Sequence, residues 1–140
     1  MTALLVDTCT FLWWAAGDPH VPESVRARLR DPDVSVFLSA VSAWEIGMLS
    51  RPRFGRPNPL VFLPDPKTWF ARVLARPGVR LTPLTTDIAI DASSLPEPLH
   101  ADPGDRLLIS TARHARAAIV TRDGKILDYG MAGHVGALAC

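Results

Sequence analysis

The sequence predicts an α/β fold built on a parallel sheet, and two observations lead to that prediction. Short apolar runs of strand length lie at residues 3–8, 34–38, 79–84 and 117–120, and segments with helical patterns separate them. An apolar run of this length is typical of a strand that is buried on both faces, as the strands of parallel sheets are. Strands that alternate with helices in this way favour parallel pairing through right-handed crossovers.

The helices begin and end with ordinary boundary signals. Thr8 can cap a short helix over residues 8–16, and Pro22 begins a second helix that ends near Arg30. Cys9 follows the first strand closely, so we expect a packed thiol there. The other expected elements are helices at residues 42–50, 66–75, 85–95 and 105–115, and a short edge strand at residues 135–138.

The length of the chain predicts one domain. Its 140 residues are enough for a single ordinary core, so we expect one domain over residues 1–140. Residues 51–65 differ from the rest, because they hold four prolines and three arginines. We expect a loop or an extended arm there, since each flank is too short to fold alone.

Charge and cysteine content exclude several classes of protein. The net charge of +1 excludes a broadly basic nucleic-acid-binding protein, so any contact with nucleic acid must come from a local patch. The two cysteines lie near opposite ends of the chain without Cys-x-x-Cys spacing, which excludes a zinc knuckle. No apolar stretch is long enough to span a membrane and no signal peptide is visible, so we expect a cytoplasmic protein.

Two acidic residues near strand ends each have a structural and a functional interpretation. Asp7 ends the first strand, at the edge where open α/β sheets bind their ligands. It could cap the next helix instead, but Thr8 is available for that role. Glu45 completes a Ser-x-x-Glu capping box with Ser42, which is the better local interpretation. The functional alternative for Glu45 is that the strand ending at Ser39 places it at the same edge as Asp7.

Two further aspartates are equally open. Asp105 begins a helix directly after Asp102, and one of the two must satisfy the free backbone N–H groups of that helix, which leaves the other available. Asp123 lies in an Asp-Gly turn, but it also follows the strand that ends at Val120.

Together these four carboxylates predict a metal site. Carboxylates that converge without a counter-charge repel one another and raise each other's pKa values. A divalent cation removes that cost, and ligation by oxygen alone favours Mg²⁺ or Mn²⁺ over Zn²⁺. Such sites activate water and stabilise the charge of phosphodiester cleavage. The four histidines have no shared metal-binding spacing and do not form a rival site.

Four short segments also match a known family. In chain order they are Leu4-Leu5-Val6-Asp7-Thr8, Ser39-Ala40-Val41-Ser42-Ala43-Trp44-Glu45-Ile46, Asp102-Pro103-Gly104-Asp105-Arg106-Leu107-Leu108-Ile109 and Val120-Thr121-Arg122-Asp123. The chain resembles the PIN-domain family, and more narrowly the VapC-like toxins of type II toxin–antitoxin pairs. The resemblance implies a three-layer α/β/α sandwich with a mostly parallel sheet, and a metal-dependent ribonuclease that cleaves RNA internally.

The resemblance also implies roles for individual residues. The four acids Asp7, Glu45, Asp105 and Asp123 correspond to the catalytic, metal-binding set of the family. Three accessory residues are expected beside them, namely Thr8, Asp102 and Thr121. The family usually has a bulky residue where this chain has Gly104, so we expect a looser start to that helix.

Partners follow from the same resemblance, which implies a cognate antitoxin protein and a homodimer. We expect the antitoxin to lay an amphipathic helix in an aromatic groove, while Trp44 belongs to the core. The expected groove residues are Trp13, Trp14, Phe54 and Phe62. The candidates for contacts with RNA phosphates are Arg51, Arg53, Arg56, Arg106 and Arg122.

Two other functions remain open at this point. One is a PIN-like domain that has lost catalysis and only binds a partner, although none of the four acids is missing. The other is phosphoryl transfer of the haloacid-dehalogenase type, because Val6-Asp7-Thr8 resembles its nucleophile motif. That motif requires a second aspartate two residues after the first, where this chain has Cys9.

Overall fold

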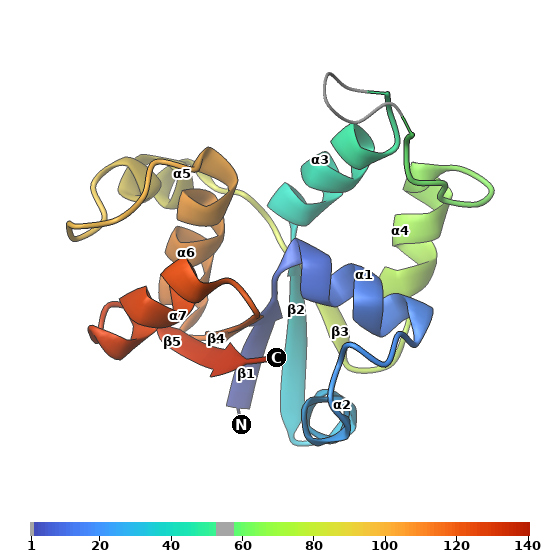
Figure 1. Cartoon of the computed structure of the whole chain (residues 1–140), viewed down its shortest axis with the longest axis horizontal. Helices are drawn as coiled ribbons and strands as arrows, with labels where there is room; N and C mark the ends of the chain where they lie inside the picture. Colours follow the sequence, from blue (N-terminus) through green and yellow to red (C-terminus); the bar gives the residue numbers. More distant parts are fainter. Residues whose placement is uncertain (1, 53–57) are drawn as a thin grey trace.

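The computed structural model describes residues 2–52 and 58–140. Within this part of the chain, five strands form one sheet in the order β3-β2-β1-β4-β5, and every neighbouring pair is parallel (Figure 1). The strands are β1 (Thr2–Val6), β2 (Val34–Ser39), β3 (Val79–Thr82), β4 (Ala118–Thr121) and β5 (Gly136–Ala139). The predicted α/β class and parallel sheet are confirmed, and β5 is the short edge strand that was expected.

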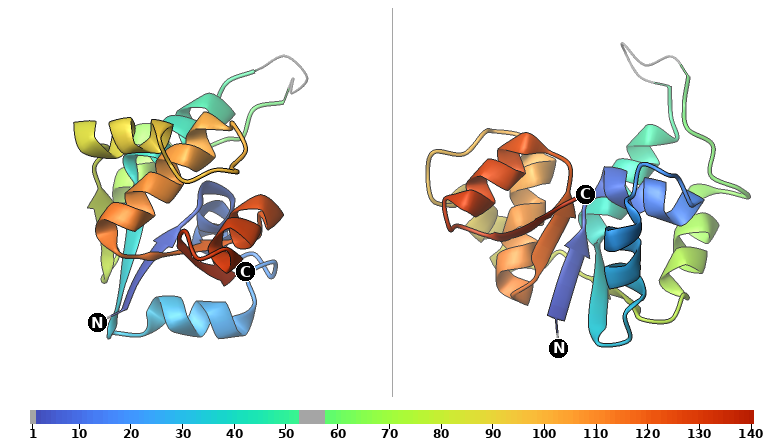
Figure 2. Two further views of the ribbon diagram at one scale, coloured as in Figure 1. Left: turned by 90° about the vertical axis from the view of Figure 1, so that its left-hand side faces the viewer. Right: turned by 60° about the horizontal axis from the view of Figure 1, so that its bottom comes forward.

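Helices cover both faces of the sheet and make a three-layer sandwich (Figures 1 and 2). Helices α1, α2 and α4 pack on one face, α6 and α7 pack on the other, and α5 packs mainly against α6. Helix α3 contributes side chains to the cores on both sides. The helices are α1 (Thr8–Ala16), α2 (Glu23–Arg30), α3 (Ala40–Leu49), α4 (Pro66–Leu74), α5 (Thr86–Ser93), α6 (Pro103–Ala115) and α7 (Gly124–Met131).

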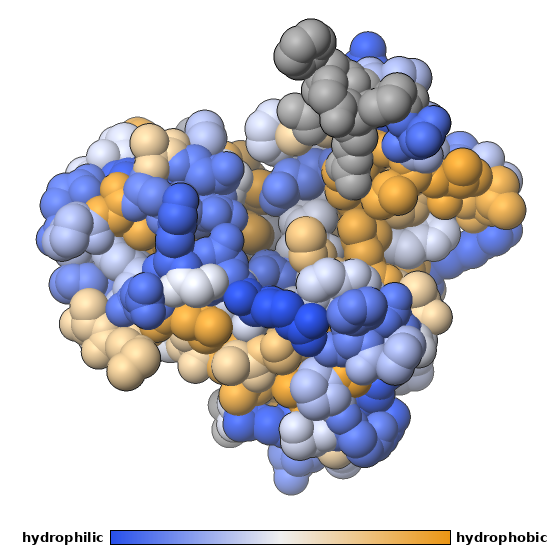
Figure 3. All heavy atoms as spheres, viewed as in Figure 1, coloured by the Kyte–Doolittle hydropathy of each residue, from blue (hydrophilic) through white to orange (hydrophobic). Residues whose placement is uncertain are grey.

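The described second half of the Pro- and Arg-rich stretch, residues 58–65, returns to the body of the protein. Arg53, Phe54 and Arg56, which were predicted to bind RNA or a partner, lie outside the described residues. The N–H of Leu60 donates to the carbonyl of Leu49 at 2.8 Å, and apolar side chains gather in this region beside α4 (Figure 3). The three exposed apolar side chains of the segment are Leu60, Val61 and Leu63.

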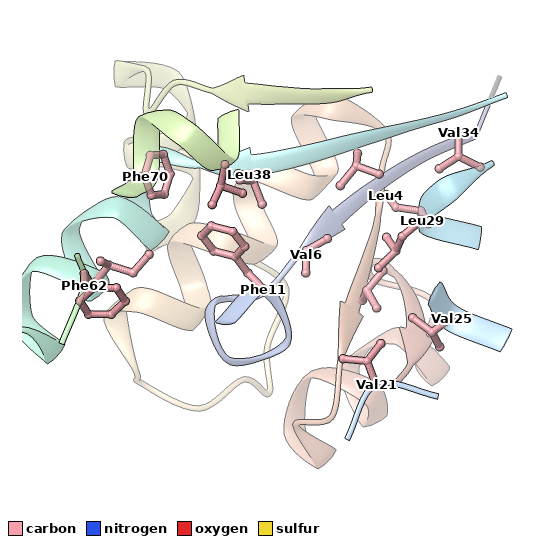
Figure 4. Packing of buried hydrophobic residues seen from close by; sticks show 14 residues of the cluster. Leu4, Val6, Phe11, Val21, Val25, Leu29, Val34, Leu38, Phe62 and Phe70 are labelled. Atoms are coloured by element: carbon pink, nitrogen blue, oxygen red, sulfur yellow. The ribbon is translucent and has the colours of Figure 1, made fainter. Parts of the chain in front are cut away.

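Phe62, from the same segment, is not an exposed groove residue as predicted. Its side chain is only 7% exposed, and its ring meets the ring of Trp69 edge-on with 4.9 Å between centroids. Phe62 therefore belongs to the core beneath α4, because the chain folds back at this point and buries it (Figure 4).

The central strand β1 divides the core into two parts. Successive side chains of a strand point to opposite faces of the sheet. Leu4 and Val6 accordingly pack with Phe11 of α1, whereas Leu5 packs with the side chains of α6 and α7. All four are at most 1% exposed. This two-sided burial explains the unbroken apolar run in the sequence, and it leaves Asp7 as the first polar side chain after the strand.

Two further sequence-based expectations are wrong, and one helix was missed. Trp44 is 54% exposed, because α3 buries Val41, Ser42 and Ile46, and position 44 lies about 200° around the helix from positions 42 and 46. Cys9 is exposed instead of packed. Helix α7, which follows Asp123, was not predicted at all.

Within residues 2–52 and 58–140, no helix is both long and apolar enough to cross a membrane.

The two-sided burial of β1 gives a stability prediction. Leu5→Ala should lower the free energy of unfolding by about 2–5 kcal/mol, because it opens a cavity at a fully buried position. Leu81→Ala on the edge strand β3 is the matched control, since Leu81 is 47% exposed. Urea denaturation of both variants measures the difference, and equal losses would contradict the assigned burial.

Candidate active site

Asp7 joins β1 to α1 and is fixed by two hydrogen bonds. Its Oδ1 accepts the N–H of Thr10 at 2.8 Å, and its Oδ2 accepts the hydroxyl of Thr121. The side chain is 9% exposed. Asp7 is therefore the N-cap of α1, and the prediction that Thr8 caps this helix is wrong. The hydroxyl of Thr8 is free for another role because the carboxylate before it has taken the capping position.

Glu45 does not close a capping box. Ser39 caps α3 by accepting the N–H of Val41 at 3.0 Å, so the helix begins at Ala40 and Ser42 already lies inside it. The preferred local interpretation of Glu45 is therefore wrong. Its Oε1 instead accepts the hydroxyl of Thr8 at 2.8 Å, and Thr8 Oγ1 lies 2.9 Å from the buried Ser42 Oγ. The Thr8 hydroxyl, which is itself in contact with Ser42, thus holds Glu45 toward the end of β1.

Asp102 and Asp105 have separate roles, as the sequence suggested. Asp102 caps α6, because its Oδ1 accepts the N–H of Asp105 at 2.9 Å. The carboxylate of Asp105 is left free, and its Oδ2 lies 2.7 Å from Nε2 of His100. Gly104, between them, is buried in the first turn, where a Cβ atom would lie 3.5 Å from Cδ of Glu45. The absence of a side chain at Gly104 therefore leaves space beside the Glu45 carboxylate.

Asp123 begins α7 and is connected to Asp7 by one hydroxyl. Its Oδ1 accepts the N–H groups of Lys125 and Ile126 at 2.8 and 3.2 Å, which makes it an N-cap. Its own N–H donates to Thr121 Oγ1 at 3.0 Å, and the same Thr121 hydroxyl donates to Asp7. Thr121 is fully buried at the end of β4. It therefore fixes the spacing between two acids that are 116 residues apart in the sequence.

All four acids line one pocket of about 240 Å³ at the carboxyl edge of the sheet. The other lining residues are Thr8, Cys9, Trp13, Leu108 and Arg122. Among the described residues, however, no three His, Cys, Asp or Glu side chains are grouped so that they could hold a metal ion as they stand. The pocket gathers the carboxylates without arranging them as a finished ligand set.

Negative charge in this pocket is not balanced. Burial raises the pKa of Glu45, and the charges of Asp105, Asp102 and Asp7 raise it further, while the hydrogen bond from Thr8 lowers it. Burial also raises the pKa of Asp105, with added repulsion from Asp102 and Asp123, and His100 opposes that rise. The repulsion that the sequence predicted is therefore present at two of the four acids.

Two arginines that were predicted to bind RNA make contacts with other groups of the protein. Arg106 donates from Nε to the carbonyl of Ala92 at 3.0 Å and from Nη1 to the carbonyl of His100 at 3.3 Å. Its side chain is only 15% exposed. Arg122 does line the pocket, but its guanidinium lies 4.9 Å above the ring of Trp13, and its Nε donates to the carbonyl of Cys140 at 3.1 Å.

The remaining predicted contact residues are spread over the surface. Arg51 is exposed at the end of α3. Trp13 is half-buried and faces the acid pocket rather than an open groove. Trp14 is also half-buried, with the guanidinium of Arg76 6.0 Å from its ring centroid. Trp13 and Trp14 therefore do not join Phe62 in one aromatic groove.

Sequence reasoning missed two residues at the site. Ser42 was assigned to a helix cap, and nothing in the sequence indicated its contact with Thr8 across 34 positions. His100 was left unassigned, and the only signal was its position two residues before Asp102. Both act on an acid from outside the pocket.

The family model of the PIN domain matches residues 4–130 of the chain. A curated relative, ribonuclease VapC22 of Mycobacterium tuberculosis, is 26% identical over 129 residues, which cover 92% of this chain and 93% of the relative.

Solved structures that cover nearly the whole chain include two complexes. VapBC2 from Rickettsia felis, bound to a DNA fragment from its promoter, matches with a TM-score of 0.64 at 9% identity, covering 99% of this chain and 98% of the other. A toxin–antitoxin complex from Klebsiella pneumoniae matches with a TM-score of 0.60 at 19% identity, covering 96% and 95%. At these identities the likeness shows a shared fold.

The raised pKa of Asp105 gives a prediction for the metal-free protein. Its folded-state pKa lies above the ordinary value near 4, so the folded chain keeps a proton over a pH range in which the unfolded chain has lost it. Stability must therefore fall as the pH rises through that range. Asp105→Asn removes the charge, so in excess chelator its melting temperature should exceed that of the wild type at pH 7.

The same gain should vanish below about pH 4, where the wild-type carboxyl is protonated in both states. Asp91→Asn is the control, because Asp91 is an exposed acid that pairs with His114. Thermal unfolding at the two pH values measures the effect. A stabilisation of Asp105→Asn that is equally large at both values would contradict the raised pKa of Asp105.

Proposed function

The chain belongs to the PIN-domain family, and from that premise we propose that it is a divalent-metal-dependent ribonuclease, the toxin of a type II toxin–antitoxin pair. The observation that carries the proposal is the convergence of Asp7, Glu45, Asp105 and Asp123 in one pocket. The match to ribonuclease VapC22 supports RNA as the substrate. The toxin–antitoxin complex among the similar structures supports the toxin role.

The donor chemistry of the pocket fits Mg²⁺ or Mn²⁺. Four carboxylates offer oxygen ligands only, and burial together with repulsion from the other acids raises the pKa values of Glu45 and Asp105, a cost that a bound cation would offset. In this proposal the four acids hold the ion, with Thr8, Asp102 and Thr121 as accessory residues. A bound ion would supply an activated water and would stabilise charge on the phosphodiester.

The residues of the chain divide into two kinds of support for such an ion. Asp7 and Asp123 are N-caps whose oxygens accept backbone N–H groups, so their positions are fixed by α1 and α7. Glu45 and Asp105 are held by side chains alone, by Thr8 and by His100. Since the acids are not grouped as ligands, we infer that Glu45 and Asp105 adjust toward the two fixed aspartates.

The two alternatives have less support. The partner-binding domain without catalysis would be expected to lack an acid, yet all four line the pocket. The dehalogenase-type enzyme needs a carboxylic acid two residues after Asp7, and that position holds the thiol of Cys9.

A protein partner completes the proposal, with a landing site that differs from the predicted aromatic groove. A pocket of about 700 Å³ lies between α3 and α4, and most of its lining is apolar, including Ala43, Ile46, Pro66 and Phe70. A groove of this kind suits the apolar face of an amphipathic helix. We assign it to a helix of the cognate antitoxin. The homodimer expected from the resemblance stays a prediction.

The first test is cleavage of RNA. Wild-type protein should cut RNA in the presence of Mg²⁺ or Mn²⁺ and stop in excess chelator. Asp7→Asn and Glu45→Gln should each lose more than roughly 100-fold in rate, because even outer-shell partners of a metal are worth about 10–100-fold. Asp91→Asn is the control for a remote acid.

Gel analysis of cleaved RNA measures these rates. Near-normal cleavage by Glu45→Gln would remove Glu45 from the ligand set, and cleavage that persists in chelator would defeat the metal mechanism. A small phosphate ester should be left intact, and its hydrolysis would favour the dehalogenase-type alternative.

The second test concerns the partner. Expression of the chain alone should arrest growth, and co-expression of the neighbouring small open reading frame should restore it. Gly47→Arg should keep the arrest and lose the rescue, because Gly47 lines the groove and a Cβ there meets no atom within 4 Å. Ala71→Arg adds the same charge to the exposed surface of α4 and should still be rescued. Rescue of both variants would place the partner elsewhere.

A further inference from the structure

Among the described residues, one side chain from outside the acid pocket makes a polar contact with the Asp105 carboxylate. That side chain is His100. Its Nε2 lies 2.7 Å from Asp105 Oδ2, and the two side chains are 15% and 26% exposed. With the ring hydrogen on Nε2, the neutral imidazole donates to the carboxylate. A hydrogen bond this short in a half-buried position restricts the rotation of the carboxylate.

Several hydrogen bonds hold the loop that carries His100. Arg106 donates from Nη1 to the carbonyl of His100 at 3.3 Å. Tyr129 donates its hydroxyl to the carbonyl of Pro96 at 2.7 Å, and the N–H of Leu99 donates to Glu97 Oε2 at 2.8 Å. Since the backbone on which the imidazole stands is held by α6 and α7, the contact with Asp105 is supported by the fold.

A second pair of histidine and aspartate, which joins α6 to α5, shows what is particular about His100. His114 Nε2 lies 2.6 Å from Asp91 Oδ2, but both side chains are more exposed, at 36% and 56%. That pair lies outside the acid pocket, whereas the pair of His100 includes one of the four converging acids. The two pairs consist of the same chemical groups, and they differ in whether the aspartate lines the acid pocket.

His100 contacts one of the two carboxylate oxygens of Asp105 from outside the acid pocket. Carboxylates that bind metals are themselves hydrogen-bonded by outer partners, which orient them.

We propose that His100 is a positioning residue that orients the Asp105 carboxylate toward a divalent ion. The inference rests on the proposed function, because it needs the metal site, but it assigns a role to a residue outside the four acids. The contact leaves Asp105 Oδ1 for the ion, while Oδ2 is held by the imidazole. Arg106 contributes by holding the loop of His100 through the hydrogen bond to its carbonyl.

The test compares three substitutions of His100 by their affinity for Mn²⁺. The amide nitrogen of Gln reaches about as far as Nε2 of His, whereas that of Asn is one methylene shorter. His100→Ala and His100→Asn should weaken Mn²⁺ binding by roughly 10–100-fold, and His100→Gln should bind nearly as tightly as the wild type. His114→Ala, which removes the equivalent pair, should bind Mn²⁺ as the wild type does.

Isothermal titration calorimetry at one pH gives these affinities, and the rise in melting temperature with added Mn²⁺ gives an independent reading. Unchanged affinity in His100→Ala, with or without lost stability, would show that the contact is merely structural. Tighter binding in His100→Ala would show that His100 competes with the ion. Loss in all three variants would show that the donated hydrogen bond is not the cause. Failure of the wild type to bind Mn²⁺ would instead defeat the proposed metal site.

Discussion

Repulsion between carboxylates at one edge of the sheet is the interaction around which this structure is arranged. Parallel strands all end at the same edge, so β1, β2 and β4 bring their following residues together there. Burial raises the pKa values of Glu45 and Asp105, the neighbouring acids add to the rise, and hydrogen bonds from Thr8 and His100 oppose it. Folding must therefore supply enough burial elsewhere to hold charges that separate freely in the unfolded chain. The fully buried β1, with cores on both sides, supplies it where the acids are attached.

The four acids are not held in the same way. The difference depends on whether an acid caps a helix or lies within one. Asp7 and Asp123 cap α1 and α7, and the Thr121 hydroxyl contacts both residues. Their positions are consequences of the backbone. Glu45 and Asp105 lie within helices and depend on side chains for their direction. The four acids therefore share 240 Å³ with two positions set by the backbone and two set by side-chain contacts, and among the described residues no three of them are grouped as metal ligands.

Much of this arrangement could be predicted from the sequence, and the failures have common physical causes. The apolar run before Asp7 and the strand ends at Ser39 and Val120 were enough to predict a parallel sheet with acids at one edge. The capping role of Ser39 was hidden, because two serines three residues apart both suit a cap and the choice depends on where β2 ends. The contact of His100 depends on a loop held by Tyr129, which lies 33 residues from Pro96, the residue whose carbonyl it binds. Trp44 is exposed although it is large and apolar, because other side chains decide which face of α3 is buried.

The central claim is that the four carboxylates serve one divalent ion. The most direct measurement is anomalous diffraction from a crystal soaked in Mn²⁺, since Mn²⁺ is located by its own signal whatever the RNA target. The account predicts a peak within the pocket, in contact with oxygens of Asp7 and of the acids that adjust toward it. It also predicts that the peak disappears in an Asp7→Asn crystal soaked in the same way. A wild-type crystal with no peak among the four carboxylates, or with its peak elsewhere on the surface, would contradict the account.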